Sequence, residues 1–192
     1  MHTFKVGISL VFLVLASPFP AWADKENTVL IRNSGQNYSG NLMLNQAAGT
    51  EQQQVNSRAI SAGAAAPVRV LQQRGVMTFP EDLNAQVRIE GSAFSQGSGV
   101  LGVNQGAGMG NQQINAFRMA IGAVPESLDD SSLAQNAAPL SHNSGAAVPN
   151  NGERLVEIDD RAFVGSRGAV QLNQSAGVGN RTVNHLGIRI AP

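Results

Sequence analysis

The chain lacks cysteine altogether, has few aromatic residues, and shows no excess of charge of either sign across its 192 residues. Without cysteine an exported chain cannot be stabilised by disulfide bonds, so its stability must come from backbone pairing or from oligomerisation. Aromatic residues make up 5% of the chain while glycine contributes 21 residues, and such a composition fills a conventional globular core poorly. Two classes remain open, a disordered chain or a repeat architecture with narrow layers.

The balanced charge excludes one class of partner and favours another. The 13 basic and 13 acidic side chains are scattered singly along the chain. No basic stripe is present, so the sequence predicts no nucleic-acid partner. A net charge of zero lets copies approach each other without repulsion, which favours self-association.

Long hydrophobic runs are absent after residue 24, whereas the first residues are typical of a secretory signal peptide. An apolar run extends from Val6 to Ala16, and Ala21 and Ala23 supply small side chains at both specificity positions of a cleavage site. The alternative is a membrane anchor, but the run is shorter than the roughly 20 residues that span a bilayer. We therefore expect residues 1–23 to be a signal peptide that is removed after Ala23, with export through the periplasm.

The main signal in the remaining chain is a repeat that occurs three times. The motif Asn-Gln-x-Ala-Gly stands at residues 45–49, 104–108 and 173–177, with spacings of 59 and 69 residues. The carboxamide residues at equivalent positions are Asn45, Gln46 and Asn56 in the first copy, Asn104, Gln105 and Asn115 in the second, and Asn173, Gln174 and Asn184 in the third. A register shared by three copies argues against permanent disorder, since disorder requires no register.

The match continues upstream in two of the copies, where a Val-x-Ile pair stands at residues 87–89 and 156–158. An unchanged spacing places Thr28 and Leu30 at these positions of the first copy, which carries the weaker match. Ala93-Phe94 likewise aligns with Ala162-Phe163. Large side chains are rare in this chain, and we expect the two phenylalanines to fill a layer between sheets.

The repeats and the stretches between them differ in composition. The first connecting stretch begins with an Ala/Gly/Pro run, and the second contains three prolines with many Ser, Asn and Ala residues; both compositions are typical of flexible linkers. The sequence predicts a signal peptide at 1–23, repeat 1 at 28–62, a linker at 63–85, repeat 2 at 86–121, a linker at 122–154 and repeat 3 at 155–190.

Within each copy the side chains alternate between apolar and polar, which predicts strands. Glycines follow the alternating stretch and permit a sharp reversal, because glycine adopts positive φ at little cost. The expected turn glycines are Gly49 in the first copy, Gly108 and Gly110 in the second, and Gly177 and Gly179 in the third. Each copy is therefore expected to form about three short strands joined by glycine turns.

Such a unit cannot bury its own apolar face, so we expect an all-β fold in which the three imperfect repeats stack as a β-solenoid or cross-β layer structure. Stacking would place the equivalent carboxamides above one another, where they donate and accept hydrogen bonds along the stacking axis. The pattern leaves open whether the layers stack within one chain or between chains.

The repeat resembles a known family. The pattern Gly-x-x-x-x-Asn-Gln-x-Ala-Gly-x-x-(Asn/Gln)-x-x-(Val/Ile)-Asn, in three copies after a signal peptide, is similar to the fibril subunits of the Fap system (functional amyloid in Pseudomonas). The resemblance implies an extracellular fibre that supports biofilm, built of repeats that each form one layer and exported through a dedicated outer-membrane pore. The short linkers resemble those of the minor, nucleating subunit.

One departure from that family keeps an alternative open. Fibril subunits of the family often carry Cys-x-Cys near the C-terminus, and this chain has no cysteine. The alternative is a periplasmic accessory protein of the same system that regulates fibril assembly. For the fibril subunit, the expected partners are other copies of the chain, homologous fibril subunits and the export pore.

Motifs for catalysis or cofactor binding are not supported by the sequence. His142 and His185 are far apart and have no convergent partners for a metal site or a catalytic triad. The acidic pair Asp159-Asp160 lacks the spacing of a calcium loop, and we interpret it as a solubilising group beside an aggregation-prone strand. We therefore expect no enzymatic activity, no cofactor, no metal site and no small-molecule substrate.

Overall fold

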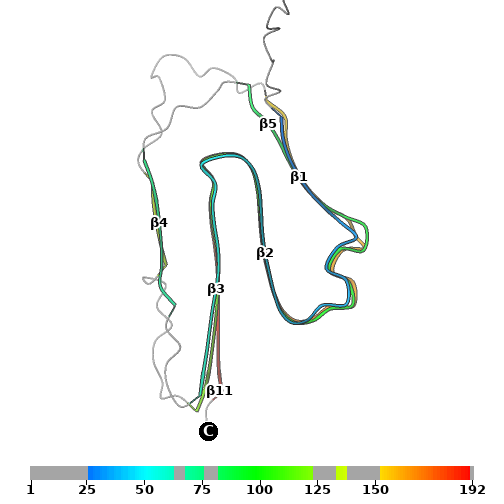
Figure 1. The fold of residues 1–192 in the computed structure, drawn as a ribbon, viewed down its shortest axis with the longest axis vertical. Coiled ribbons are helices and arrows are strands. Elements are labelled where there is room, and N and C mark those ends of the chain that lie inside the picture. Colours follow the sequence, from blue (N-terminus) through cyan, green and yellow to red (C-terminus); the bar gives the residue numbers. More distant parts are fainter. Residues whose placement is uncertain (1–25, 63–67, 76–81, 123–132, 138–151, 191–192) are drawn as a thin grey trace, which may run out of the picture.

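The computed structural model of the chain describes residues 26–62, 68–75, 82–122, 133–137 and 152–190. These residues form strands joined by turns and loops (Figure 1). None of the described segments is a helix long and apolar enough to cross a membrane. Residues 1–23, including the expected cleavage positions Ala21 and Ala23, lie outside the described part of the chain.

Each repeat forms one layer of three strands. Layer 1 contains β1 (Glu26–Arg32), β2 (Ser39–Thr50) and β3 (Gln53–Ala62); layer 2 contains β5 (Asn84–Glu90), β6 (Ser98–Met109) and β7 (Gln112–Ile121); layer 3 contains β9 (Arg154–Ile158), β10 (Arg167–Val178) and β11 (Arg181–Ile190). In every layer the chain runs along the first strand, passes through an arch, returns along the second and reverses again into the third (Figure 1).

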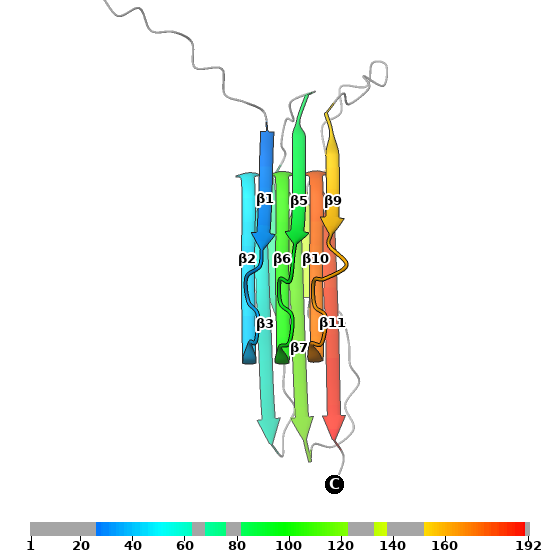
Figure 2. The same cartoon turned by 90° about the vertical axis from the view of Figure 1, so that its right-hand side faces the viewer.

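The three layers stack in parallel, with layer 2 in the middle. The sheets have the orders β1-β5-β9, β10-β6-β2 and β11-β7-β3, so every strand pairs with its equivalent in the next repeat (Figure 2). The register pairs Asn104 with Asn45 on one side and with Asn173 on the other. The expected all-β stack of repeats is therefore confirmed, and the three layers stack within a single chain.

The period-two pattern of β2 and its equivalents decides what each side of the strand contacts. Leu42 and Leu44 point toward β1 and the arch, where they pack on the cluster that contains Ile31. Asn45 points the other way and donates from Nδ2 to the backbone oxygen of Gln54 in β3. The second strand of each layer thus separates an apolar core from a polar one.

The middle layer carries most of the fully buried side chains because layers cover it on both sides. Leu101 and Val103 are 0% exposed, whereas their equivalents in layer 1, Leu42 and Leu44, are only partly buried. Phe94 is 1% exposed and belongs to the same apolar cluster, as expected for a side chain that fills the space between sheets. The outer layers therefore retain apolar surface that a further layer could cover.

The first strand of layer 1 is shifted by one residue from the register expected from the sequence. β1 places Val29 opposite Val87 and Ile31 opposite Ile89, so the expectation for Thr28 and Leu30 was wrong. The arch that follows β1 is one residue shorter than the arch of layer 2, which changes the spacing before β2. Burial of Val29 and Ile31 selects this register, because a one-residue slip would turn them outward.

Two short strands lie inside the ranges that the sequence assigned to flexible linkers. β4 (Val70–Arg74) and β8 (Leu133–Ala137) pair with each other in parallel and form a separate two-stranded sheet beside the stack. Gln72 of β4 is 4% exposed and donates from Nε2 to the backbone oxygens of Gln53 and Gln113. Both short segments are therefore regular structure, and β4 is anchored to β3 and β7 by hydrogen bonds.

Candidate assembly interface

An asparagine column runs along the stacking axis between the second and third strands of the layers. Asn104 donates from Nδ2 to Oδ1 of Asn45 at 2.9 Å, and Asn173 donates in the same way to Asn104 at 3.0 Å. Asn104 is 0% exposed and Asn173 is 5% exposed. Each amide in this column therefore bonds to the equivalent amide of the neighbouring layer, and the amides of Asn104 and Asn173 are buried whereas Asn45 at the layer 1 end is exposed.

A second asparagine column lies on the facing strands. Asn115 donates to Oδ1 of Asn56 at 3.0 Å, and Asn184 donates to Oδ1 of Asn115 at 3.1 Å. The two columns also join within each layer, as where Asn115 donates to Oδ1 of Asn104 at 3.0 Å. The amides thus form a ladder whose rungs tie the second strand of each layer to the third.

The same amides satisfy the backbone of the opposite strand. Asn104 donates from Nδ2 to the backbone oxygen of Val55, and Asn115 donates to that of Val103, both at 3.0 Å. Since an amide carries two N–H donors, one serves the axis and the other serves the facing strand. Replacing such a side chain by an apolar one would leave buried carbonyl oxygens without these donors.

A glutamine column lies on the opposite side of the second strands, next to β1 and its equivalents. Gln105 donates from Nε2 to Oε1 of Gln46 at 3.1 Å, and Gln174 donates to Gln105 at 2.8 Å. Gln46 also donates to the backbone oxygen of Leu30, which joins β2 to β1. All nine carboxamides expected from the sequence therefore stand in columns that connect the layers; their part in assembly is considered below.

The columns have a direction. In the two asparagine columns and in this glutamine column, the donor always belongs to the layer later in the sequence. One further column runs the opposite way, with Gln54 donating to Oε1 of Gln113 and Gln113 donating to Oγ of Ser175. The two ends of the stack are therefore chemically different, because one end presents mainly donors and the other mainly acceptors.

This reversed column and a further rung at the turn were not among the carboxamides expected from the sequence. Asn180 donates from Nδ2 to Oδ1 of Asn111 at 3.0 Å. The repeat alignment contains a signal for both, since it aligns Gln54 with Gln113 and Asn111 with Asn180. Ser175 gives no such signal, since it lies on the second strand of layer 3, whereas Thr182 occupies the position of layer 3 that is equivalent to Gln113.

A glycine column follows the carboxamides where the chain turns. Gly49, Gly108 and Gly177 have φ values of +101°, +110° and +116°. A Cβ atom at Gly49 would lie 1.8 Å from the backbone oxygen of Gly108, and one at Gly108 would lie 2.0 Å from that of Gly177. Glycine is therefore required here by close approach between layers as well as by φ. Gly110 and Gly179 also have positive φ, as expected of turn residues.

A second glycine column shows that the backbone at one end of the stack has open space beside it. A Cβ atom at Gly99 would lie 2.0 Å from the backbone oxygen of Gly40, and one at Gly168 would lie 2.0 Å from that of Gly99. At Gly40 itself no atom lies within 4 Å of such a Cβ. The outer side of layer 1 thus has the same close-approach geometry as the inner contacts, without a neighbouring layer to fill it.

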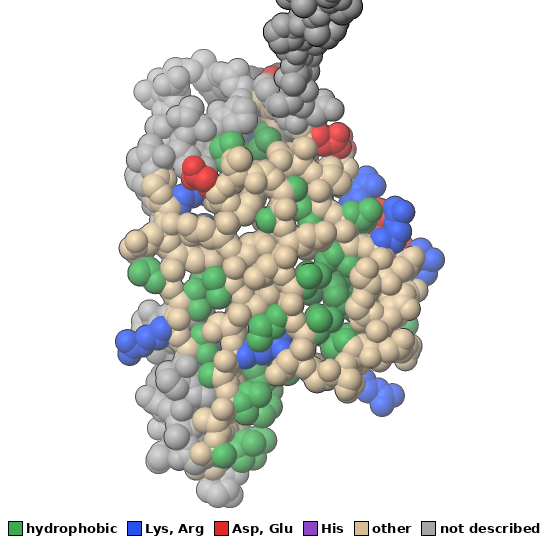
Figure 3. Space-filling model, in the orientation of Figure 1, with side chains coloured by type: hydrophobic (Ala, Val, Ile, Leu, Met, Phe, Trp, Pro, Cys, Tyr) green, Lys and Arg blue, Asp and Glu red, His purple; other side chains and the backbone are tan. Residues whose placement is uncertain are grey.

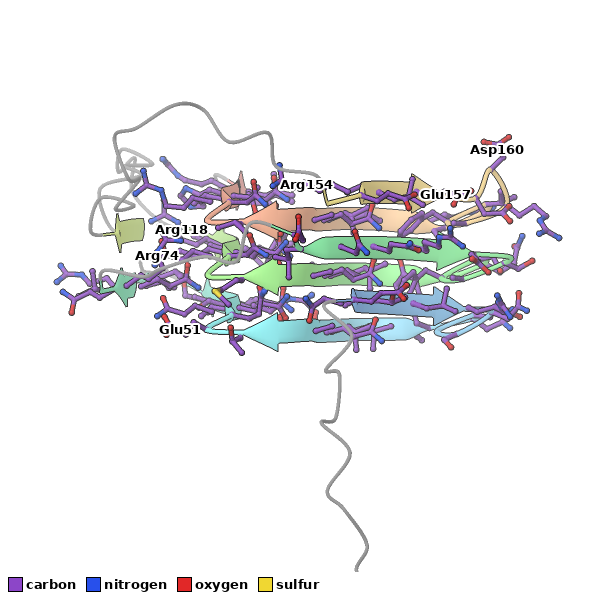
Figure 4. The ribbon with its side chains drawn as sticks, turned by 90° about the horizontal axis from the view of Figure 1, so that it is seen from above. Glu51, Arg74, Arg118, Arg154, Glu157 and Asp160 are labelled. Atoms are coloured by element: carbon purple, nitrogen blue, oxygen red, sulfur yellow. The ribbon has the colours of Figure 1, made fainter. Side chains whose placement is uncertain are left out.

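Several charged side chains lie around the rim of the stack. Figure 3 looks onto the layer 1 end, where uncharged polar and hydrophobic groups cover most of the face, most charged groups lie toward its margin, and one basic group lies within its lower part. Arg32 pairs with Glu90 of layer 2 at 2.6 Å, and Arg88 approaches Glu157 of layer 3 at 3.5 Å. Figure 4 shows Arg154, Glu157 and Asp160 on layer 3, at the opposite end of the stack.

Asp159 has a carboxyl group whose pKa is markedly lowered in the folded chain. Hydrogen bonds from the side chain and backbone of Arg161, with a further one from the backbone N–H of Gly91, hold its pKa well below the ordinary value. The acidic pair that the sequence suggested as a solubilising group therefore includes a carboxylate that joins layer 3 to layer 2. Among the described residues, no group of three or more His, Asp or Glu side chains could hold a metal ion.

Comparison with known proteins gives one family. A family model described as "Functional amyloid protein FapB/FapC family" matches residues 17–191. No solved structure matches the chain.

Proposed function

The chain belongs to the functional amyloid protein FapB/FapC family, and from this membership and the geometry of its layers we propose that it is a secreted fibril subunit with a minor, nucleating role. Copies would stack along the axis of the three layers into extracellular cross-β fibres that support biofilm. The carboxamides of the three columns would continue from each copy into the next.

The observation that carries this proposal is a stack with two unfinished ends. Within the described residues, the strands of layers 1 and 3 pair with layer 2 on one side and with no strand on the other. Their outer backbone N–H and C=O groups form a template for a further parallel layer, which is the usual hazard of exposed edge strands. A second copy placed about 4.8 Å beyond either end would pair these groups.

The direction of the amide columns favours one way of stacking. Layer 1 of a second copy, placed on layer 3 of the first, would direct the Nδ2 group of Asn45 toward Oδ1 of Asn173. This repeats the contact that Asn104 makes with Asn45 inside the chain. A contact between two layer 1 ends would instead bring amide donors toward amide donors. We therefore propose head-to-tail growth.

The glycine at the layer 1 end supports the same arrangement. The open space beside Gly40 is suited to the backbone oxygen of Gly168 in a neighbouring copy, just as the space beside Gly99 holds that of Gly40. The apolar side chains left partly exposed on the outer layers, such as Met43 and Val170, would be covered by the same contact.

The family and the sequence together support the proposed route to the cell surface. We propose that residues 1–23 direct export into the periplasm, with cleavage after Ala23, and that the chain then leaves through an outer-membrane pore. In the proposed fibre the partners are other copies of the chain and homologous fibril subunits.

Seeded assembly of purified residues 24–192 tests the proposal. The protein is diluted from denaturant, thioflavin T fluorescence is followed with and without fibre fragments, and the product is examined by fibre diffraction. A lag that fragments remove, with reflections near about 4.7 and 10 Å, is the expected result. A soluble chain that gives no signal and delays fibre growth by a homologous subunit would instead identify a periplasmic regulator of assembly.

A further inference from the structure

A column of charged groups runs along the rim beside the first strand of each layer. The register places Glu90 opposite Arg32 of layer 1. On its other side, Asp159 donates from its backbone N–H to the oxygen of Ile89, which places Asp159 beside Glu90 in layer 3. Along the axis of one chain the column therefore reads Arg32, Glu90, Asp159.

This column is unbalanced in the isolated chain. Arg32 donates to Oε2 of Glu90 from both Nε and Nη2, at 2.8 and 2.6 Å. Asp159 follows Glu90 with the same charge, and its carboxylate bonds to Arg161, the second residue after it in sequence. The layer 1 end of the column thus ends in the guanidinium of Arg32, whereas the layer 3 end ends in the carboxylate of Asp159, whose charge Arg161 of the same layer partly offsets.

We propose that Arg32 of one copy and Asp159 of the next form the charge contact that selects the register and the direction of the junction between copies. The inference rests on the head-to-tail stacking proposed above and adds a specificity pair to it. Continuing the register by one layer sets Arg32 of the incoming copy over Asp159. Its guanidinium then lies between that carboxylate and Glu90 of its own chain, and the charges alternate more evenly along the fibre.

Other charges at equivalent positions of the first strands do not duplicate this role. The same register brings Glu26 close to Glu153 at the exposed start of the first strands, a contact of like charge. Glu157 comes to lie over Leu30, which carries no charge. Arg32 with Asp159 is therefore the attractive contact that the junction gains along the first strands, and a copy docked in another register loses it.

A charge exchange tests the pair. In the double variant Arg32→Glu/Asp159→Arg, two variant copies still place opposite charges across their junction. A variant copy on a wild-type fibre end places like charges there, whichever end grows. We expect the double variant to assemble with itself, and to elongate wild-type fibre fragments on the order of tenfold more slowly than wild-type protein does, since exposed pairs contribute modestly.

The matched control exchanges a pair that lies inside the chain. Arg88→Glu/Glu157→Arg reverses a contact between layers 2 and 3 on the same strands and leaves Arg32 and Asp159 unchanged. This control should elongate wild-type fragments about as fast as the wild type. Loss of the intrachain contacts of Arg32 with Glu90 and of Asp159 with Arg161 would slow the first variant on its own fragments as well, whereas a junction contact slows it only on wild-type fragments.

Elongation of wild-type fibre fragments by wild-type protein distinguishes failure of this inference from failure of the proposed function. If wild-type protein does not elongate its own fragments, the proposed fibre is wrong. If it does, and the Arg32→Glu/Asp159→Arg variant elongates wild-type fragments equally fast, the pair is overturned. If that variant does not assemble at all, the single variants Arg32→Gln and Asp159→Asn test the pair instead. The inference requires both to weaken the salt dependence of the elongation rate, and an unchanged salt dependence overturns it.

Discussion

The ring of Phe94 occupies the space beside Gly35, so that a Cβ atom at position 35 would lie 2.6 Å from Cδ1 of the ring. Phe163 of layer 3 stacks on Phe94 with the ring centroids 5.4 Å apart and the planes inclined by 20°. Gly35, Phe94 and Phe163 thus form one column along the stacking axis. The Phe94 ring of layer 2 fills the volume that the glycine of layer 1 leaves open. The glycine of layer 1 is therefore a packing requirement.

Gly35→Ala should destabilise the fibre by about 2–5 kcal/mol per copy. The new methyl group meets the Phe94 ring, which costs about 1–3 kcal/mol as overpacking. The φ of +69° adds about 1–2 kcal/mol for a residue other than glycine. Gly122→Ala is the matched control, with a φ of +70° and no atom within 4 Å of the new methyl group. The measurement is the denaturant midpoint of fibre dissolution, and equal shifts for both variants would contradict the packing argument.

Asn104→Asp should lengthen the lag of assembly at pH 7 more than tenfold. The amide is 0% exposed and donates to Asn45 and to the backbone oxygen of Val55, and a carboxylate can donate to neither. A buried charge without a partner costs about 3–5 kcal/mol. The same change at Asn173 should act in the same direction, since that amide is also buried in the column.

Asn41→Asp is the control for this change, because Asn41 lies exposed on β2 and accepts a hydrogen bond from Arg58. It should leave the lag nearly unchanged. Thioflavin T kinetics at equal protein concentration measures all three variants. A lag for Asn104→Asp equal to that of the wild type would remove the amide column from the account of assembly.

The contribution of Asp159 should depend on pH in a defined direction. The hydrogen bonds from Arg161 lower its pKa in the folded chain from the ordinary 3.8, so folding favours the ionised form. Its contribution is therefore complete above pH of about 4 and is lost as the pH falls toward the lowered value. The stability difference between the wild type and Asp159→Asn should stay constant from pH 8 to about 5 and shrink below about 4. Denaturation across this range measures it, and a difference that grows toward acid would reverse the assignment.

Gln72→Ala should weaken the contact between the β4 and β8 sheet and the stack. The Gln72 side chain donates to backbone oxygens of layers 1 and 2 at 3.0 and 3.2 Å. Its loss leaves buried acceptors without this donor, at about 1–2 kcal/mol. Gln73→Ala is the control, since the Gln73 side chain is exposed and the contact to Gln53 uses the Gln73 backbone oxygen. Hydrogen exchange of the β4 amides should rise in the first variant and remain unchanged in the second.

Much of the fold could be predicted from the repeat itself. Three copies of one motif in register predicted three equivalent layers, and the alternation around Leu42 and Leu44 predicted which side of β2 meets the apolar core. β4 and β8 were missed because segments of five residues among Pro, Ala and Gly show too little periodicity. The shift of Val29 was missed because a change of one residue in loop length leaves no mark on the motif.

The sequence by itself determined the repeat, its strand pattern and the positions of the stacked carboxamides, because local periodicity and identity between copies are written into it. Only the tertiary structure decided that the copies stack within one chain, that the amide columns have a direction, and that Gly35 lies beneath Phe94. These depend on which backbone lies beside which, and contacts between residues 59 or 69 positions apart follow from the closure of the layers. The placement of the opposite charges of Arg32 and Asp159 at the two ends of one column likewise follows from the stacking alone.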